Sequence, residues 1–275
     1  MPPIRPFAAA LAVAGALATA PPAMAVTNGT PDGGAHPYVG QFVGDFDPSQ
    51  PGLEAGCAGT LISPTVFLTA AHCIAHRPAR QAARLFVSLS PQWTSPGAPA
   101  ASDLHSVAAY HYDPGFDEPD PTHIHDLAVL VLDPPVAGVS PARLPAAGSL
   151  ERFQPGGPNG ALFDSVGYGT CGYRRGGGPL ELQCDPYVTG VYERKQATAG
   201  LAALTPDRLV LLTEDALGFG GACVADSGSA ILSHGINLLV AMPAWGDRMC
   251  EAHVSGPRLD TPQARAFLGA YVELP

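Results

Sequence analysis

The chain has 275 residues, of which 46% are hydrophobic and 14% charged, and its formal net charge is −10. That apolar content can fill a core, which argues against a disordered chain, and the negative charge argues against nucleic-acid binding through a basic face. The 32 glycines and 30 prolines favour short strands joined by many turns over long helices.

Residues 1–25 are predicted to be a secretory signal peptide. Arg5 precedes the uncharged run FAAALAVAGALATA, and small residues stand at Ala23 and Ala25, after which cleavage would occur. This run is too short to span a bilayer comfortably, and no later segment reaches the ~18 uninterrupted apolar residues of a membrane helix. We therefore expect a secreted, extracellular protein with no membrane association once the signal is removed.

All six cysteines follow the signal. In an oxidising compartment an even number of cysteines favours disulfides, but six allow 15 pairings and composition does not choose among them. No Cys-x-x-Cys pair indicates a structural zinc site. The cysteines are Cys57, Cys73, Cys171, Cys184, Cys223 and Cys250.

Beyond residue 25 the chain consists mainly of short stretches rich in Val, Leu, Phe and Thr, separated by Gly and Pro. Such stretches at this spacing are typical of an antiparallel sandwich or barrel, and not of a parallel sheet with crossover helices. In chain order we expect strands within 36–44, 57–73, 83–90, 105–112, 126–133, 161–169, 187–199, 208–213, 229–246 and 254–260.

One clear helix signal appears, near the carboxyl end. Thr261 can cap the first turn, and Pro262 suits the first helical position. Apolar residues then recur at three-to-four spacing: Ala264, Phe267, Leu268 and Tyr271.

A Pro/Gly-rich connector, 134–160, separates two groups of expected strands. We place a domain boundary near residue 145, which gives an N-terminal domain at 26–145 and a C-terminal domain at 146–275. The first domain would hold His72 and Asp126, and the second would hold the nucleophile and the helix.

Three residues supply the groups of an activated serine. His72 follows an apolar strand, Asp126 stands at the entrance of another, and Ser227 lies in a predicted turn. Taken one at a time, each residue has a non-catalytic explanation: a histidine packed in the core, an aspartate that forms a turn, and a serine in an ordinary turn. Serine is a weak nucleophile unless a base takes its proton, imidazole titrates near neutrality, and a carboxylate on its other nitrogen fixes the tautomer. Together the three predict a Ser-His-Asp hydrolase.

Four ordered segments resemble those of the chymotrypsin/trypsin family of serine proteases, here of the secreted, bacterial type: CAGTLISPTVFLTAAHC, HDLAVLVLD, CVADSGS and AWGDRMC. The resemblance covers nearly the whole mature chain. It implies an all-β fold of two antiparallel six-stranded β-barrels with a C-terminal α-helix. It also implies that His72 is the general base, Asp126 orients it and Ser227 is the nucleophile.

The same resemblance implies the disulfides and an activation step. The implied bridges are Cys57–Cys73 and Cys223–Cys250, which leave Cys171 for Cys184. Signal cleavage would free the ammonium of Val26 to pair with Asp226, and this removal alone would activate the protein.

Two positions depart from the family's pattern. The oxyanion hole would be formed by the backbone N–H groups of Ala225 and Ser227, but Ala225 stands where the family has glycine. A positive φ there costs alanine roughly 1–2 kcal/mol. Ala244 stands where a family serine hydrogen-bonds the catalytic aspartate. Both changes predict a lower rate without abolishing the mechanism.

The predicted substrate pocket is open and apolar-lined. Gly221 falls where trypsin-like enzymes place an acid, so cleavage after Arg or Lys is not expected, and a medium or large uncharged side chain would fit. Asp247, Arg248 and Glu251 lie near the predicted rim. The predicted pocket residues are Gly221, Ala222, Val224, Trp245, Gly246 and Gly256.

The sequence thus predicts a monomeric secreted serine endopeptidase that cleaves proteins or peptides through an acyl-enzyme, with no cofactor and no metal. A catalytically weakened or inactive binding protein on the same fold (a pseudoprotease) is the main alternative, which Ala225 and Ala244 favour. A metal protein would need more well-spaced ligands than the histidines at 105, 111, 123 and 125 offer. An α/β-hydrolase esterase is disfavoured because no G-x-S-x-G turn is present and the order of the three residues differs.

Overall fold

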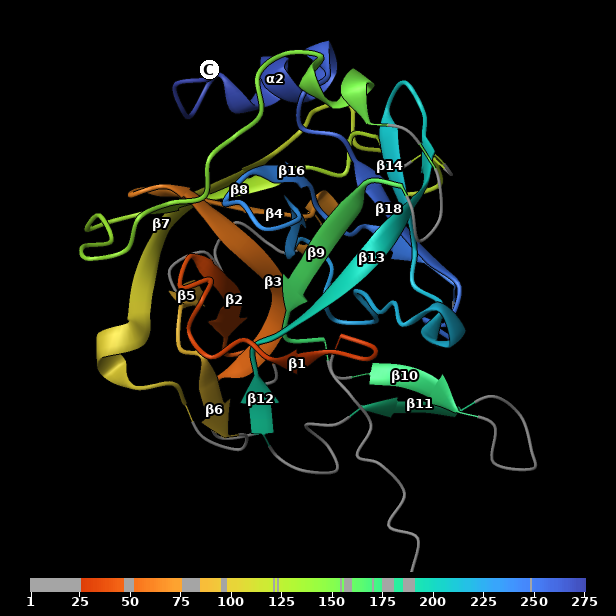
Figure 1. Ribbon diagram of the computed structural model, residues 1–275. Helices are drawn as coiled ribbons and strands as arrows, with labels where there is room; N and C mark the ends of the chain where they lie inside the picture. The colour runs from red at the N-terminus through yellow and green to blue at the C-terminus, as the bar shows by residue number, and fades with distance from the viewer. Residues whose placement is uncertain are drawn as a thin grey trace, which may run out of the picture.

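The structure is a computed structural model that describes residues 26–46, 52–75, 85–94, 98–120, 122, 124–153, 155, 160–169, 171–174, 181–184, 191–247 and 249–275. The predicted signal peptide, His123 and Arg248 lie outside the described residues. Most of the described chain is β-structure, in two main sheets (Figure 1).

The first sheet is a closed antiparallel barrel with strand order β2-β3-β4-β8-β7-β5. Alternate side chains point inward, and Phe42, Phe67 and Leu130 are fully buried in its core. Its strands are β2 (Val39–Gly44), β3 (Glu54–Ser63), β4 (Val66–Thr69), β5 (Leu85–Ser88), β7 (Leu104–Tyr112) and β8 (Ala128–Leu132).

The second sheet has the order β16-β15-β9-β13-β14-β18-β17, with β1 added beside β13. The sheet curls so that its first strand, β16, approaches the end of β18. An isolated antiparallel bridge joins Ala241 to Arg258, and Leu259 N–H donates to Val240 O at 3.0 Å. Its strands are β1 (Thr30–Pro31), β9 (Leu162–Gly167), β13 (Lys195–Leu204), β14 (Arg208–Leu212), β15 (Ala230–Ser233), β16 (Leu239–Ala241), β17 (Trp245–Gly246) and β18 (His253–Pro257).

Two small sheets complete the β-structure. β6 (Gln92–Thr94) pairs with β12 (Val191–Glu193), so this sheet joins the two halves of the chain. β10 (Cys171–Arg174) pairs with β11 (Glu181–Cys184), and Figure 1 shows this hairpin outside the two main sheets. The short 3₁₀ turns are η1 (Ala71–Cys73), η3 (Ala101–Asp103), η4 (Ser149–Arg152) and η6 (Asp215–Leu217).

The predicted helix is α2 (Pro262–Leu268). Thr261 Oγ1 accepts a hydrogen bond from Ala264 N–H at 3.2 Å, as its predicted capping role requires. The helix ends before Gly269, so Tyr271 lies beyond it. The predicted fold is therefore confirmed: the chain is mostly β, with one closed barrel, one curled half-barrel sheet and a C-terminal helix.

A buried ion pair fastens the segment after Val26 to both sheets. Arg194 Nε donates to Asp32 Oδ2 at 2.9 Å, and both side chains are 1% exposed. Nη1 of Arg194 donates to Val39 O at 2.9 Å and to the Tyr168 hydroxyl at 3.2 Å. Burial by itself would raise the pKa of Asp32, but hydrogen bonds from His36 and Arg194 outweigh burial and lower the pKa to about 2.

We predict that Arg194→Met lowers the free energy of unfolding by about 3–5 kcal/mol, because it leaves the Asp32 carboxylate buried without its cation. Denaturant titration near pH 7 measures this loss. Lys195→Met is the matched control: Lys195 Nζ lies 3.8 Å from the part-exposed Glu193, a pair worth less than about 1 kcal/mol. Equal losses in the two variants would contradict the prediction.

Candidate active site

His72 is carried by the 3₁₀ turn that follows β4. The strand ends at Thr69, the backbone stays extended at Ala70, and η1 then turns the chain so that Ala71 is buried while the His72 side chain is 31% exposed. The predicted Cys57–Cys73 disulfide is present and ties this turn to β3. The imidazole is thus presented at the surface from a fixed turn.

Asp126 binds His72 twice. Its Oδ2 lies 2.6 Å from His72 Nδ1, and its Oδ1 accepts a hydrogen bond from the His72 backbone N–H at 2.8 Å. Asp126 is fully buried just before β8, and β8 pairs with β4 so that Ala128 lies opposite Thr69. A carboxylate can only accept here, so the proton sits on Nδ1 and Nε2 is left as the basic nitrogen.

Ser227 lies in a tight turn that docks on the first barrel. Gly228 N–H donates to Pro243 O at 2.8 Å, and Gly228 has φ +81°. A Cβ on Gly228 would lie 2.7 Å from both Ala58 O and Ala70 N, so only glycine allows this approach. The turn carrying Ser227 therefore contacts the backbone two residues before His72. Among the described contacts, no hydrogen bond joins Ser227 to His72.

Asp226 anchors the turn from inside. Its carboxylate is fully buried and accepts hydrogen bonds from Gly169 N–H at 2.6 Å and Cys223 N–H at 2.9 Å. Burial raises its pKa to about 6, although the backbone hydrogen bonds oppose the rise. A side chain at Gly167 or at Gly169 would overlap the carboxylate. Within the described residues, no cation accompanies this acid.

Val26 lies close to this acid. It is fully buried, and its backbone N–H donates to Gly169 O at 3.2 Å, while Gly169 in turn donates to Asp226. Thr27 forms an antiparallel bridge with Gly221. In the full chain the Val26 nitrogen is an amide with φ +50°, an uncommon torsion for a β-branched residue.

Ala225 adopts the left-handed backbone conformation expected of an oxyanion-hole glycine, with φ +75°. None of the described residues accepts a hydrogen bond from the N–H of Ala225 or of Ser227. Ala244 donates its own N–H to Ser255 O at 3.0 Å and has no side chain that could reach Asp126.

A cavity of about 290 Å³ opens beside Ser227. Four predicted pocket residues line it, together with the Cys223–Cys250 disulfide, whose predicted pairing is present. The other two predicted residues do not line it: Gly221 packs on Thr213, and Gly256 lies against Met242 O. The lining residues are Ala222, Cys223, Val224, Ala225, Ser227, Pro243, Ala244, Trp245, Gly246, Asp247, Cys250 and Val254.

Asp247 is the one acidic side chain of this lining, and backbone amides occupy it. Its oxygens accept hydrogen bonds from the N–H groups of Met249, Glu251, Ala252 and His253. Burial raises the pKa of Asp247, but these four donors outweigh it and hold the pKa below its ordinary value. Asp247 therefore shapes the loop, and its carboxylate keeps its negative charge in the cavity wall.

The remaining candidates have structural explanations or lie outside the described side chains. Cys171 and Cys184 are opposite residues in the β10–β11 register, but their side chains lie outside the described residues. Cys57, His72 and Cys73 cluster, but both sulfurs are consumed by the disulfide and cannot ligate a metal. Within the described part of the chain no other group of His, Cys, Asp and Glu could hold an ion.

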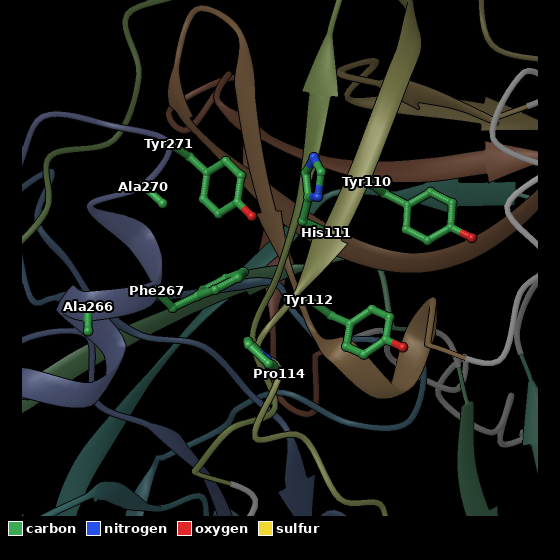
Figure 2. A pocket seen from close by; sticks show the side chains of 8 residues that line it. All are labelled: Tyr110, His111, Tyr112, Pro114, Ala266, Phe267, Ala270 and Tyr271. Atoms are coloured by element: carbon green, nitrogen blue, oxygen red, sulfur yellow. The ribbon is translucent and has the colours of Figure 1, made fainter.

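A second cavity, of about 430 Å³, lies between β7 and α2 and includes no residue of the His72–Asp126–Ser227 set. Figure 2 shows its aromatic lining, with Tyr110 and Tyr112 on one side of the strand and His111 on the side of Tyr271. The eight residues are Tyr110, His111, Tyr112, Pro114, Ala266, Phe267, Ala270 and Tyr271.

Sequence reasoning missed two parts of this region. Gly169 supplies the amide that binds Asp226 and the carbonyl that binds Val26, and Pro243 contributes both a cavity wall and the acceptor for Gly228. No sequence signal marks Gly169, because backbone groups act there. Pro243 stands directly before the Ala-Trp-Gly segment and could have been included with it.

Comparisons with known proteins agree with this geometry. The family model described as trypsin matches residues 31–264. No curated protein sequence matches the chain. Human heparin binding protein has a TM-score of 0.60 and 16% identity, over 89% of this chain and 95% of its own. Neuropsin, a serine protease expressed in the limbic system of mouse brain, has a TM-score of 0.56 and 16% identity, over 87% and 96%.

At 16% identity these two structures establish only the fold. Separately, none of the described helices is long and apolar enough to cross a membrane. The family model covers most of the chain, and by that match the chain belongs to the trypsin family.

Proposed function

We propose that this protein is a secreted serine endopeptidase that hydrolyses peptide bonds through an acyl-enzyme. The observation that carries the proposal is the pair of hydrogen bonds from His72 to the buried Asp126. They leave Nε2 of His72 free to act as a base on the side of the molecule where the Ser227 turn docks.

The steps follow from these positions. His72 Nε2 takes the proton of Ser227 Oγ while the oxygen attacks the scissile carbonyl, and Asp126 stabilises the imidazolium. The N–H groups of Ala225 and Ser227 bind the developing oxyanion. His72 then gives its proton to the leaving amine. A water molecule, activated by the same imidazole, releases the acyl group.

The cavity beside Ser227 supports a preference for an uncharged side chain before the scissile bond. Ala222, Val224 and Val254 give it apolar walls, and backbone N–H groups already occupy the oxygens of its one acid, Asp247. At Gly221, where the resemblance places the acid of trypsin-like enzymes, this chain has no carboxylate, and Gly221 is not among the residues that line the cavity. We therefore propose that the enzyme does not cleave preferentially after Arg or Lys.

Activation by signal removal is part of the proposal. Cleavage after Ala25 would turn the Val26 amide into an ammonium close to Asp226. It would also relieve the unfavourable φ of Val26, because no preceding carbonyl would remain to clash with its side chain. The Val26 ammonium would then supply the cation that Asp226 lacks among the described residues.

A second candidate is a non-catalytic binding protein on this fold, favoured by the strained Ala225. One matched structure carries the name heparin binding protein. A net charge of −10 disfavours binding of this chain to a polyanion such as heparin.

The first test uses a peptide library and a serine-directed phosphonate. We expect mature protein to cleave after uncharged residues and to be labelled at Ser227, with Ser227→Ala losing both. Ser229→Ala is the control, because Ser229 is a buried neighbour outside the proposed chemistry. Equal cleavage by the Ser227→Ala variant would overturn the assignment. Absent labelling of the folded wild type would favour the binding protein.

We predict that Ala225→Gly changes kcat by less than about threefold, because the Ala225 N–H already has the backbone orientation that the oxyanion hole needs. Relief of the positive φ should raise the free energy of unfolding by at most about 1 kcal/mol, because glycine also increases the conformational entropy of the unfolded chain, which offsets part of the gain. A rise in kcat of about 100-fold would instead mean that the wild-type peptide flips in solution.

We predict that one residue added before Val26 lowers kcat/KM at least about 100-fold, since it keeps the buried Asp226 without a cation. With a pKa of about 6 against 3.8 unfolded, Asp226 stabilises the extended form below pH ~4 and loses that stabilisation as the pH rises through 6. Relative to the mature form, the unfolding free energy of the extended form should fall by about 3 kcal/mol between pH ~3 and pH ~7. Matching pH profiles would contradict the pairing.

A further inference from the structure

A hydrogen-bonded cluster outside the catalytic groups joins three distant parts of the chain. Asp113 follows β7, His125 immediately precedes Asp126, and Gln263 lies in the first turn of α2. His125 Nδ1 lies 3.0 Å from Asp113 Oδ2, and Gln263 Nε2 donates to the same oxygen at 2.8 Å. The cluster therefore ties the terminal helix to the segment that carries the catalytic aspartate.

The contact with Asp113 fixes the tautomer of His125. Nδ1 lies 3.0 Å from Asp113 Oδ2, and a carboxylate only accepts, so the ring donates to Asp113 through Nδ1–H. Gln263 Nε2 lies 3.0 Å from Nδ1 and donates to the same Asp113 oxygen. The Asp113 side chain is 8% exposed, so loss of its partners would leave a buried acceptor unsatisfied.

The backbone around Asp126 is tied to the same cluster. Leu127 N–H donates to His125 O at 2.8 Å, and Asp113 N–H donates to Leu127 O at 2.9 Å. Asp126 is thus flanked on both sides by residues bonded to the cluster. Because His72 provides the only described donors to the Asp126 carboxylate, this backbone decides where the carboxylate sits.

The His125 ring packs against Gly115, which has no side chain to displace it. A Cβ on Gly115 would lie 2.6 Å from His125 Nδ1, and Gly115 N–H donates to Asp113 Oδ1 at 2.8 Å. The ring is therefore seated against a turn that any larger residue would push away.

We propose that His125, held by Asp113 and Gln263, is a positioning residue that fixes Asp126 relative to His72. The inference rests on the proposed function, since it concerns how the catalytic base is oriented. His125 touches no reacting atom and acts through Asp126.

The test compares His125→Ala with Gly115→Ala, which displaces the same ring while keeping every donor and acceptor. His111→Ala is the matched control, because the His111 ring stacks on Tyr271 beyond α2, with ring centroids 5.2 Å apart (Figure 2), and no described hydrogen bond joins that ring to Asp113, His125 or Gln263. We expect both test variants to lower kcat about tenfold, equivalent to ~1.4 kcal/mol, with KM unchanged, and the control to do neither.

A second measurement needs no turnover. The ¹H resonance of the His72 Nδ1 proton should shift and exchange faster with solvent in His125→Ala and Gly115→Ala than in wild type or His111→Ala. The inference would be overturned if the resonance were unchanged in both test variants, or if these variants changed KM and left kcat at the wild-type value. A wild type that hydrolyses no peptide would overturn the proposed function alone, because the resonance would still report whether His125 positions Asp126.

Discussion

The buried carboxylate of Asp226 is the constraint on which the site depends. Taking an acid out of water is costly, and here the backbone amides of Gly169 and Cys223 offset part of that cost. These bonds fix the turn that ends at Ser227 and fix the strand end beside which Val26 lies. The raised pKa of Asp226 shows that amides alone leave the charge incompletely compensated. One side chain therefore couples the amino-terminal segment to the turn that carries Ser227.

A second constraint is the contact between the two sheets, since each half of the chain supplies only part of the site. Gly228 brings the turn that carries Ser227 against the backbone before His72. The Asp32–Arg194 pair, reaching Val39 and Tyr168, holds the amino-terminal segment between the sheets. Because these groups are buried and hydrogen-bonded, their geometry is fixed and not adaptable. Such rigidity is what a preorganised catalytic site needs.

The choice between an enzyme and a binding protein depends on small departures at this site. Ala225 keeps the backbone conformation of a glycine and accepts strain of about 1–2 kcal/mol, and its N–H stays available. Ala244 removes one potential donor to Asp126, whereas the Asp113–His125–Gln263 cluster constrains the backbone on which Asp126 stands. Ala225 concerns the proposed oxyanion donor and Ala244 the orientation of the proposed base, and neither change removes His72, Asp126 or Ser227.

The sequence by itself determined the all-β class and the capped terminal helix, because these leave local patterns in strands and turns. The cysteine pairs at 57–73 and 223–250 were implied by the family resemblance, and the structure contains both. It also marked His72 and Asp126, which the structure brings together. Only the tertiary structure decided that Gly221 and Gly256 stay out of the cavity lining, that Asp247 is occupied by amides, and that Arg194 pairs with Asp32. The Asp32–Arg194 pair joins residues far apart in the chain, and the Asp247 contacts, although local, are made by backbone N–H groups that no residue pattern marks.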